Sequence, residues 1–271
     1  MLRPVKRLAL AYYRLRGYYP TTISDSQFQC DASHAGFWRH ATKGRFEPYT
    51  YRFLSSLLTP DSVYCDVGAW IGPTVIYAAR RCKQVYCFEP DVFAYEYLLS
   101  NIRLNHLHNV IPFNIALSDS DGMVQMASFG GTPGDCQTSL IKEGAQESGL
   151  NALAMSWETW CRIANPDRID FLKIDIEGAE FDLVPTLMEY LRQHKPILHL
   201  STHAPYLPEP ERDQALARLR DLGNIYTQCF NEELERVDME ELTSEFAKTT
   251  FTSFLFVAGE DEAKAGKLFS A

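Results

Sequence analysis

The stretch Val63-Tyr64-Cys65-Asp66-Val67-Gly68-Ala69-Trp70-Ile71-Gly72-Pro73-Thr74 organises this chain. It predicts a short buried strand over residues 63–67, a turn bounded by Gly68 and Gly72, and a helix that begins at Pro73. A strand, a glycine-rich turn and a helix start, in this order, form the ligand-binding crevice of a doubly wound sheet. The sequence therefore predicts a nucleotide-type ligand at this turn.

The turn differs from the fingerprint of a nicotinamide dinucleotide enzyme. Gly68 and Gly72 are four residues apart, and the third glycine of that fingerprint is missing. Asp66 stands at the carboxyl end of the strand, where its charge would repel a pyrophosphate. The same charge attracts a ligand that carries an ammonium and a sulfonium group. These residues predict S-adenosylmethionine as the cofactor.

The composition is that of a globular protein with an acidic balance. The chain has 271 residues, enough for one domain with a substantial core, and a net charge of -9. Because binding to a nucleic-acid backbone depends on clustered lysine and arginine, this charge argues against nucleic acid as a partner. Seven cysteines without a C-x-x-C pair, and no recognisable secretion signal, are typical of a reducing compartment. We therefore expect a cytoplasmic protein.

Residues 1–20 are basic and contain no acid, with cations at Arg3, Lys6, Arg7, Arg14 and Arg16. Leucine and tyrosine residues are interleaved with these cations, and the apolar run among them is too short to span a bilayer. One interpretation is an amphipathic helix that makes peripheral contact with the inner face of a membrane or with a glycolipid. The other is a helix packed on its own domain with a solvated basic face.

From Ser62 onward, strands and helices alternate, which predicts a mostly parallel sheet. Strands are expected at residues 63–67, 84–88, 110–116, 169–176, 197–201 and 225–230, with a final antiparallel strand at 250–258. Helices are expected at residues 47–58, 73–81, 92–104, 156–164, 179 onward and 210–222. Pro112 cannot donate a ladder hydrogen bond, so the third strand should lie at a sheet edge, as the order 3-2-1-4-5 requires.

We expect residues 1–60 to form an N-terminal helical cap and residues 61–271 the main domain, with an insertion at residues 120–160. Within the cap, residues 24–33 are expected to be a loop. Within the insertion, Ser120-Asp121-Gly122 predicts a hairpin-type turn, and glycines punctuate the chain to about residue 150. That segment is either a lid over a substrate or a surface insertion without a role.

Polar residues at the ends of two further strands are candidates for cofactor binding. Glu89 follows the second strand about 20 residues after the glycine turn, the offset at which an acid accepts hydrogen bonds from both ribose hydroxyls. Asn114 ends the third strand, where its amide would either bond an adenine ring or cap a loop.

The fourth strand carries charges that a buried strand seldom tolerates. Alternation places Lys173, Asp175 and Glu177 on one side, and the last two fall at the carboxyl end, where ligands bind. These residues are either functional or a structural lysine–carboxylate pair. We expect Asp175 above all to have a catalytic role, with Lys173 and Glu177 as weaker candidates.

Two histidines flank the end of the fifth strand. His203, just beyond it, is a candidate base because the ordinary pKa of histidine suits proton abstraction near neutrality. His199, inside the strand, is expected to be a core residue with its hydrogen bonds satisfied. The two histidines and Asp175 could also be a metal cluster, but their spacing matches no tight signature, so no metal is expected.

Four motifs together resemble the FkbM family of methyltransferases. They are Asp66-Val-Gly-Ala-x-Ile-Gly72, Phe88-Glu89-Pro90, Asn105 with Ala116-Leu117-Ser118-Asp119, and Lys173-Ile-Asp175-Ile-Glu177-Gly178-Ala-Glu180. The resemblance covers about residues 45–200, and the last motif is the most specific. It implies a class I methyltransferase fold, Rossmann-like with a seven-stranded sheet and an antiparallel last strand. It also implies S-adenosylmethionine as cofactor and O-methylation of a hydroxyl on a sugar, glycan or polyketide-type acceptor.

The resemblance also implies roles for individual residues. Those implied to surround the methionine part are Asp66, Gly68, Ala69, Trp70 and Gly72. Glu89 with Pro90 would bind the ribose, Asn114, Ala116 and Leu117 the adenine, and Asp175 would lie near the methyl group. The family usually has asparagine where this chain has Trp70, and often an acid where this chain ends its fifth strand with His199 and His203.

Two rival functions are weighed against O-methylation. A methyltransferase for an amine of a protein or nucleobase is the first, but Asp175-Ile-Glu177-Gly178 stands where nucleobase enzymes typically have an Asn-Pro-Pro-Tyr type motif. A non-catalytic module that only binds the cofactor is the second, and the retained Glu89 and Asp175 argue against it.

Overall fold

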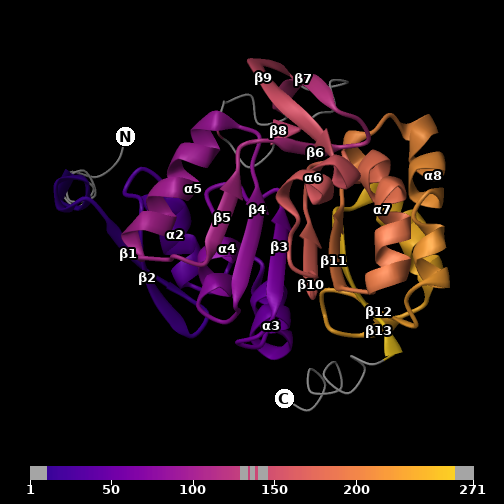
Figure 1. Ribbon diagram of the computed structural model, residues 1–271, viewed down its shortest axis with the longest axis horizontal. Coiled ribbons are helices and arrows are strands. Elements are labelled where there is room, and N and C mark those ends of the chain that lie inside the picture. Colours follow the sequence, from indigo (N-terminus) through magenta and orange to yellow (C-terminus); the bar gives the residue numbers. More distant parts are fainter. Residues whose placement is uncertain (1–10, 129–133, 135–137, 140–145, 260–271) are drawn as a thin grey trace.

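The computed structural model describes residues 11–128, 134, 138–139 and 146–259. Its centre is one eight-stranded sheet (Figure 1). The strands are β3 (Val63–Val67), β4 (Gln84–Phe88), β5 (Val110–Phe113), β10 (Phe171–Ile174), β11 (Ile197–Thr202), β12 (Gln228–Phe230), β13 (Arg236–Val237) and β14 (Thr252–Val257). Their order is β13-β12-β14-β11-β10-β3-β4-β5. The strands from β5 to β11 are parallel, and β14 runs antiparallel to β11, so the predicted topology is confirmed.

Helices lie on both faces of the sheet (Figure 1). They are α2 (Ala35–Thr42), α3 (Pro48–Leu57), α4 (Pro73–Ala79), α5 (Val92–Leu104), α6 (Trp157–Ala164), α7 (Glu180–His194), α8 (Glu209–Ala217) and α9 (Glu245–Thr249). Short 3-10 turns are η1 (Ala204–Tyr206), η2 (Arg220–Asn224) and η3 (Met239–Thr243). This is the doubly wound α/β architecture, with β13 as a short strand beyond the seven that were expected.

Alternate strand residues pack into two hydrophobic cores, one on each face of the sheet. On β3, Val63, Cys65 and Val67 belong to the core that contains α6, α7 and α8. Tyr64 belongs to the core on the other face, with α3, α4 and α5. Because side chains alternate along a strand, Asp66 points to the same face as Tyr64. The sheet therefore directs this carboxylate toward α4, the helix that follows the glycine turn.

The third predicted strand, residues 110–116, is divided in the structure. Its first part is β5, which holds Pro112 at the edge of the sheet, as predicted. The chain leaves the sheet at Asn114, whose side-chain amide donates to the carbonyl oxygens of Glu89 and Pro90 at 2.8 and 3.1 Å. Those bonds tie the chain to the end of β4, and β6 (Ala116–Ser118) joins a second sheet.

The second sheet is the insertion, with the order β6-β9-β7-β8 (Figure 1). It contains β7 (Gly122–Ser128), β8 (Thr138–Ser139) and β9 (Gln146–Ser156). The expected hairpin at residues 120–122 is wrong, because β9 lies between β6 and β7. Asp121 accepts from the backbone N–H of Ser156 and the hydroxyl of Thr159. These bonds hold residues 119–121 against the end of β9 and the start of α6. Most of the expected lid, residues 130–150, lies outside the described residues.

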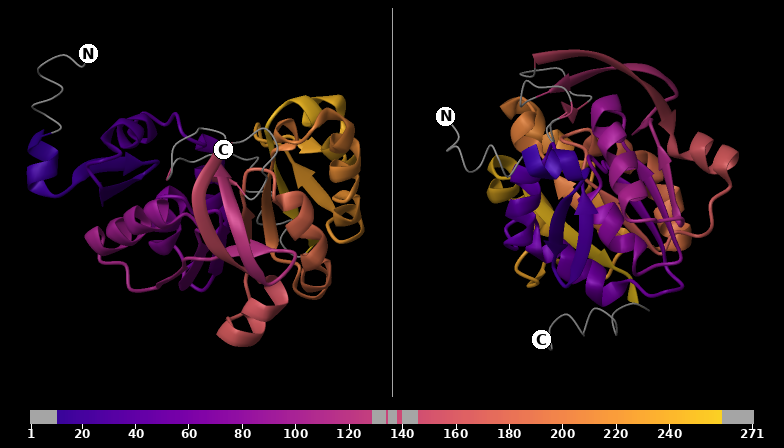
Figure 2. Two further views of the ribbon diagram at one scale, coloured as in Figure 1. Left: turned by 90° about the horizontal axis from the view of Figure 1, so that it is seen from above. Right: turned by 90° about the vertical axis from the view of Figure 1, so that its left-hand side faces the viewer.

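The N-terminal segment adds a hairpin to the expected helices. β1 (Tyr19–Ile23) and β2 (Ser26–Cys30) pair antiparallel, so the loop expected at residues 24–33 is wrong for β2. The hairpin lies on the side of the molecule that carries α5 (Figures 1 and 2). Asn105, directly after α5, fixes it there, since its side chain donates to the carbonyl oxygen of Gln29 and accepts from the Gln29 N–H.

A buried carboxylate joins this segment to the main sheet layer. Asp31, 5% exposed, accepts hydrogen bonds from the ring nitrogens of His34 and Trp38 at 2.8 and 2.9 Å. Its backbone N–H donates to the side chain of Asn101 on α5 at 2.7 Å. The segment and the sheet also share one hydrophobic core, so the start of α3 is held against the carboxyl ends of the strands.

Residues 11–16 form a short helix that leaves two of its apolar side chains in solvent. Leu15 is 90% exposed and Tyr12 is 56% exposed, and Arg14 and Arg16 are exposed beside them. Tyr13 is half-buried and packs its ring against Tyr19 of β1 at 4.7 Å, so both interpretations of residues 1–20 stay predictions. Within the described part of the chain, no helix is long and apolar enough to cross a bilayer.

Candidate active site

A cavity of about 210 Å³ lies at the carboxyl ends of β3, β10 and β11. Its wall includes Phe46 and Glu47, which precede α3, and Tyr49 in the first turn of α3. It also includes Phe251, which precedes β14, and Thr252 and Ser253 at the start of β14. The remaining wall residues are Gly68, Ala69, Trp70, Pro73, Thr74, Lys173, Asp175, Glu177, Ser201, His203 and Glu232. The structure thus brings the predicted glycine turn and the predicted catalytic residues into one space.

The glycine turn approaches the next strand too closely for a side chain. Gly68 has a φ of +92°, and a Cβ atom there would lie 1.8 Å from the carbonyl oxygen of Asp175. Gly72 has a φ of +86° and begins α4, where a Cβ atom would lie 2.5 Å from the side chain of Leu98. Glycine is required at both positions, and the backbone of the turn is left open to the cavity.

Trp70 links this turn to Glu89. Its φ is +48°, a left-handed conformation that asparagine adopts more readily than tryptophan. Its backbone N–H donates to Oε2 of Glu89 at 2.7 Å, and Oε1 accepts from the N–H of Asp91 at 2.8 Å. Burial raises the pKa of Glu89 to about 8, although both of these hydrogen bonds lower it. The carboxylate is therefore fixed at the end of β4, beside the glycine turn.

Three polar side chains form a buried row across β3, β10 and β11. Lys173 is paired in register with Asp66 on one side and with His199 on the other. All three are at most 3% exposed, and Nζ of Lys173 is 3.9 Å from Oδ1 of Asp66. Oδ2 of Asp66 accepts from the hydroxyls of Tyr64 and Thr74 at 2.9 and 2.5 Å.

The row changes the interpretation of two predicted residues. Asp66 lies beneath the cavity, next to Lys173, and is not part of the cavity wall. His199 is a core residue, as expected, but it is not satisfied: among the described residues neither ring nitrogen has a hydrogen-bond partner. Burial, together with Lys173, lowers the pKa of His199 to about 3.

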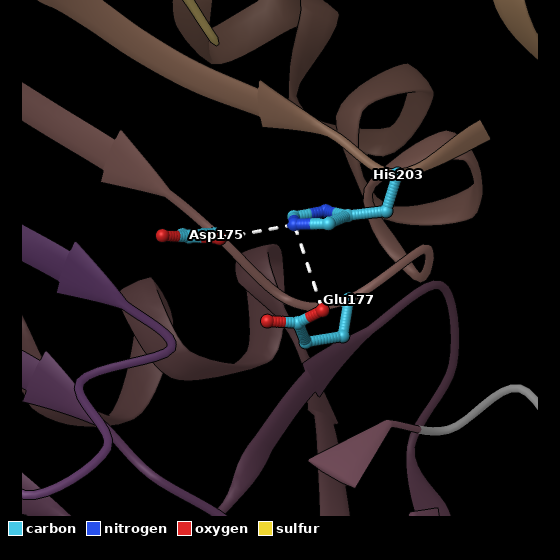
Figure 3. A group of neighbouring side chains, drawn as sticks. All are labelled: Asp175, Glu177 and His203. Carbon is cyan, nitrogen blue, oxygen red and sulfur yellow. Dashed lines mark ion pairs between the residues drawn. The ribbon is translucent and has the colours of Figure 1, made fainter. Parts of the chain in front are cut away.

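Asp175, Glu177 and His203 converge at the wall of the cavity (Figure 3). Nε2 of His203 is 3.5 Å from Oδ1 of Asp175 and 3.6 Å from Oε2 of Glu177. Nζ of Lys173 donates to the other oxygen of Asp175 at 2.8 Å. Burial opposes the ionisation of Asp175, but Lys173 and His203 lower its pKa to about 2. The Lys173–Asp175 pair is therefore both an ion pair and part of the site, which combines the two interpretations of the sequence.

Glu180, at the start of α7, orients His203 from behind. Its Oε1 accepts from the backbone N–H of His203 at 2.6 Å and lies 3.3 Å from ring atom Nδ1. This contact makes Nδ1 the donor and directs Nε2 toward the cavity. Burial lowers the pKa of His203, but Glu180, Glu177 and Asp175 together raise it to about 9.

Two wall carboxylates, Glu47 and Glu232, were not among the predicted site residues. Glu47 precedes α3 with a φ of +39° and accepts from the Thr50 hydroxyl at 3.0 Å. Burial raises its pKa to about 7 against the opposing effect of Lys173, and burial also raises the pKa of Glu232. The left-handed backbone at Glu47 is a local signal that a sequence cannot reveal, and Glu232 lies in a loop without a motif.

The residues predicted for the ribose and adenine lie outside this cavity wall. Glu89, Pro90 and Asn114 are gathered at the end of β4 by the hydrogen bonds of the Asn114 amide. Ala116 and Leu117 are buried in β6, where they pair with β9. The structure thus separates the predicted cofactor residues into a group at the cavity and a group along β4 and β6.

Comparison with known proteins gives one family. The Methyltransferase FkbM domain matches residues 66–226. Methyltransferase sdnD of Sordaria araneosa is 27% identical over 188 residues, 58% of this chain and 71% of sdnD. The 2-O-methyltransferase NoeI of Sinorhizobium fredii is 25% identical over 149 residues, 49% of this chain and 60% of NoeI. A crystal structure of Methyltransferase FkbM from Methylobacillus flagellatus is 16% identical with a TM-score of 0.45, over 83% of this chain and 54% of that one.

The chain spans less than two thirds of NoeI and of the FkbM structure. The family match itself covers more than half of this chain and includes the glycine turn, Glu89 and the motif from Lys173 to Glu180. A backbone cradle that a Cβ atom would fill, next to a wall rich in carboxylates, also fits a cationic methyl donor. The chain therefore belongs to the FkbM family of methyltransferases, and S-adenosylmethionine is its cofactor.

Proposed function

We propose that the chain transfers the methyl group of S-adenosylmethionine to a hydroxyl of a sugar, glycan or polyketide-type small molecule. The observation that carries this proposal is the shared cavity wall. The glycine turn after β3 meets Asp175, Glu177 and His203 there, so a donor site and groups able to take a proton border one space. The name of the relative NoeI, a 2-O-methyltransferase, supports oxygen as the acceptor atom.

Two neighbouring groups of residues are assigned to the methyl donor, one at the glycine turn and one at Glu89. Gly68, Ala69 and Trp70 hold the methionine part, because their backbone is open to the cavity. Glu89, fixed by the Trp70 N–H, accepts from the ribose hydroxyls. Further residues have indirect or adenine-side roles in this proposal: Asp66 and Gly72 shape the turn, and Pro90, Asn114, Ala116 and Leu117 lie toward the adenine.

When bound, the cofactor supplies a sulfonium methyl group, whose carbon–sulfur bond breaks as the bond to the acceptor oxygen forms and the hydroxyl proton leaves. The chain aligns the acceptor and excludes water, since its wall surrounds a small space. His203 and Asp175 are the residues assigned to the proton, because Nε2 of His203 and Oδ1 of Asp175 border the cavity within 3.5 Å of each other. Lys173 holds Asp175 in place, and Glu180 does the same for His203.

The wall favours a neutral acceptor with an apolar face. Phe46, Tyr49 and Phe251 offer ring surfaces, while Glu47 and Glu232 can accept hydrogen bonds from hydroxyls. Carboxylates on the wall and the net charge of -9 repel a phosphate backbone, so we propose that nucleic acid is not the acceptor. An amine acceptor is the alternative that the same carboxylates would tolerate.

A labelled-methyl transfer screen tests this function. The full chain is offered sugars, glycan ends and polyketides in one arm, and peptides with free amines and transfer RNA in the other. We expect label only in the hydroxyl arm; label confined to amines or RNA would overturn the proposal. His203→Ala and Asp175→Ala should lower turnover by about 10²–10⁴-fold while calorimetry still shows binding of S-adenosylhomocysteine. Asp182→Ala, on the exposed side of α7, is the control and should keep wild-type turnover.

A further inference from the structure

We propose that Asp175, Glu177 and His203 bind a first-row divalent metal cation at the cavity wall. The donor atoms would be Oδ1 of Asp175, Oε2 of Glu177 and Nε2 of His203. In one respect this rests on the proposed function, because the cation is given the role of holding the hydroxyl that is methylated. Binding of the cation itself stands on the geometry of the three side chains.

The two distances from His203 to the carboxylates are those that one shared cation sets. Nε2 of His203 is 3.5 and 3.6 Å from the two carboxylate oxygens, and the three residues each offer a ligand atom within 4.8 Å of the others. Metal–ligand distances of about 2.0–2.2 Å place neighbouring ligands of a tetrahedral or octahedral ion roughly 2.8–3.6 Å apart. A direct imidazolium–carboxylate hydrogen bond would draw nitrogen and oxygen to about 2.7–2.9 Å. The observed spacing therefore fits a cation between the groups better than a proton.

His203 is buried, and its Nε2 atom faces the space between the carboxylates of Asp175 and Glu177. The residue is 8% exposed, and within the described part of the chain Nε2 makes only the two longer contacts to Asp175 and Glu177. In Figure 3 the carboxylates reach the same edge of the imidazole ring from two directions. A buried ring nitrogen that faces two carboxylates needs a proton or a metal cation between them. The distances of 3.5 and 3.6 Å from Nε2 to the carboxylate oxygens favour the metal cation.

Two ligands are oriented by partners behind them. Glu180, which is fully buried, accepts from the backbone N–H of His203 and contacts Nδ1, so Nε2 is the ring nitrogen turned toward the two carboxylates. Lys173 donates to Oδ2 of Asp175 at 2.8 Å, which leaves Oδ1 turned toward His203. Partners of this kind support most histidine and carboxylate ligands of metal sites. The cluster therefore contains both the metal ligands and the residues that hydrogen-bond to the ligands, as metal sites do.

The ligand set selects the class of cation. One imidazole nitrogen and two carboxylate oxygens suit Mn²⁺, Co²⁺ or Zn²⁺ better than Ca²⁺ or Mg²⁺, which prefer oxygen alone. Three protein ligands leave positions open toward the cavity, where an acceptor hydroxyl can bind. A hydroxyl held there loses its proton to water more readily, so Asp175 and His203 act on the proton through the cation.

Calorimetry with Mn²⁺ tests the site directly. The full chain is treated with EDTA, dialysed and titrated with Mn²⁺, and we expect one ion per chain. Asp175→Asn, Glu177→Gln and His203→Gln should each weaken binding by about tenfold or more. Glu232→Gln, which removes a carboxylate of the same cavity outside the cluster, should change it less than twofold. Absence of binding at millimolar Mn²⁺, Co²⁺ and Zn²⁺, or unchanged affinity in the three cluster variants, would overturn the proposal.

A measurement on the wild-type chain covers the case that a variant does not fold. Paramagnetic Mn²⁺ should broaden the ring-proton NMR signals of His203 at concentrations that leave those of the exposed His106 sharp. Equal broadening of both would refute the site.

The test also separates this inference from the proposed function. Methyl transfer to hydroxyls that continues at full rate in EDTA, with the chain free of metal, refutes the role given to the cation and leaves the proposed function intact. Stoichiometric Mn²⁺ binding in a chain that methylates only amines supports the cation site and refutes the proposed function.

Discussion

The backbone of Gly68 packs directly on the carbonyl group of Asp175, with 1.8 Å between that oxygen and the place where a Cβ atom would stand. The glycine turn after β3 and the end of β10, to which we assign the donor and the proton acceptor, are thus joined at a point without side chains. Any residue larger than glycine at position 68 must therefore push the turn after β3 away from the end of β10.

Gly68→Ala is therefore predicted to abolish binding of S-adenosylhomocysteine and to destabilise the fold. Gly44→Ala is the matched control, because Gly44 also has a positive φ, +65°, but nothing lies within 4 Å of its Cβ position. The left-handed backbone alone should cost about 1–2 kcal/mol in the control. We expect a clearly larger loss of unfolding free energy for Gly68→Ala in urea titrations; equal losses would show that the close approach is unimportant.

Glu89→Gln is predicted to weaken cofactor binding by about tenfold or more, the value of a hydrogen bond to a charged group. Two backbone N–H groups, from Trp70 and Asp91, already point at this carboxylate, and an amide can accept from only one of them. Calorimetry with S-adenosylhomocysteine measures the effect. Glu96→Gln, an exposed position on α5, should bind as wild type does; a Glu89→Gln chain that did so too would refute the ribose assignment.

His199 is predicted to make the fold sensitive to mild acid. Its folded pKa of about 3 lies below the ordinary value of 6.5, so the unfolded chain binds more protons between these pH values. Stability therefore rises with pH in this window and is lost as the pH falls below 6.5, by up to about 1.4 kcal/mol per pH unit. Urea unfolding at pH 7 and pH 5 should show a loss about 2 kcal/mol larger for wild type than for His199→Phe. Parallel losses in the two chains would contradict this.

The exposed leucine and tyrosine of residues 11–16 lead to a prediction about membranes. With the basic residues before them, they suit peripheral contact with anionic lipid, which we propose for residues 1–20. The full chain should co-sediment with vesicles that contain phosphatidylserine, less so at high salt, and a chain that lacks residues 1–16 should not. That deletion spares β1. Equal pelleting of both chains would reject the contact.

Much of the sheet layer could be predicted because local signals agree with it. β3, β4 and α5 begin and end at the predicted residues, where apolar periodicity meets a cap such as Asp91, which accepts from the N–H groups of Phe93 and Ala94. The hairpin β1–β2 was missed because its turn at Ser24-Asp25 lacks the glycine or asparagine that marks such turns, although Ser24 has a φ of +51°.

The same contrast holds for the site. Lys173, Asp175 and His203 were predictable because the carboxyl ends of neighbouring parallel strands meet at one edge. Glu47 and Glu232 come from a helix start and a loop far apart in the sequence, and only packing brings them to the wall. The division of residues 110–118 between two sheets depends on the Asn114 amide bonds, which no periodicity encodes.

The position of β14 between β11 and β12 has a consequence for biosynthesis. On the ribosome, β12 emerges before the strand that must separate it from β11, so the far side of the sheet cannot assemble as it is made. Phe251, Thr252 and Ser253, which form one side of the cavity wall, are synthesised with that late strand. A nascent chain stalled before them would already hold the glycine turn but would lack this side of the cavity, so under the proposed function transfer would begin only once translation of the domain is nearly complete.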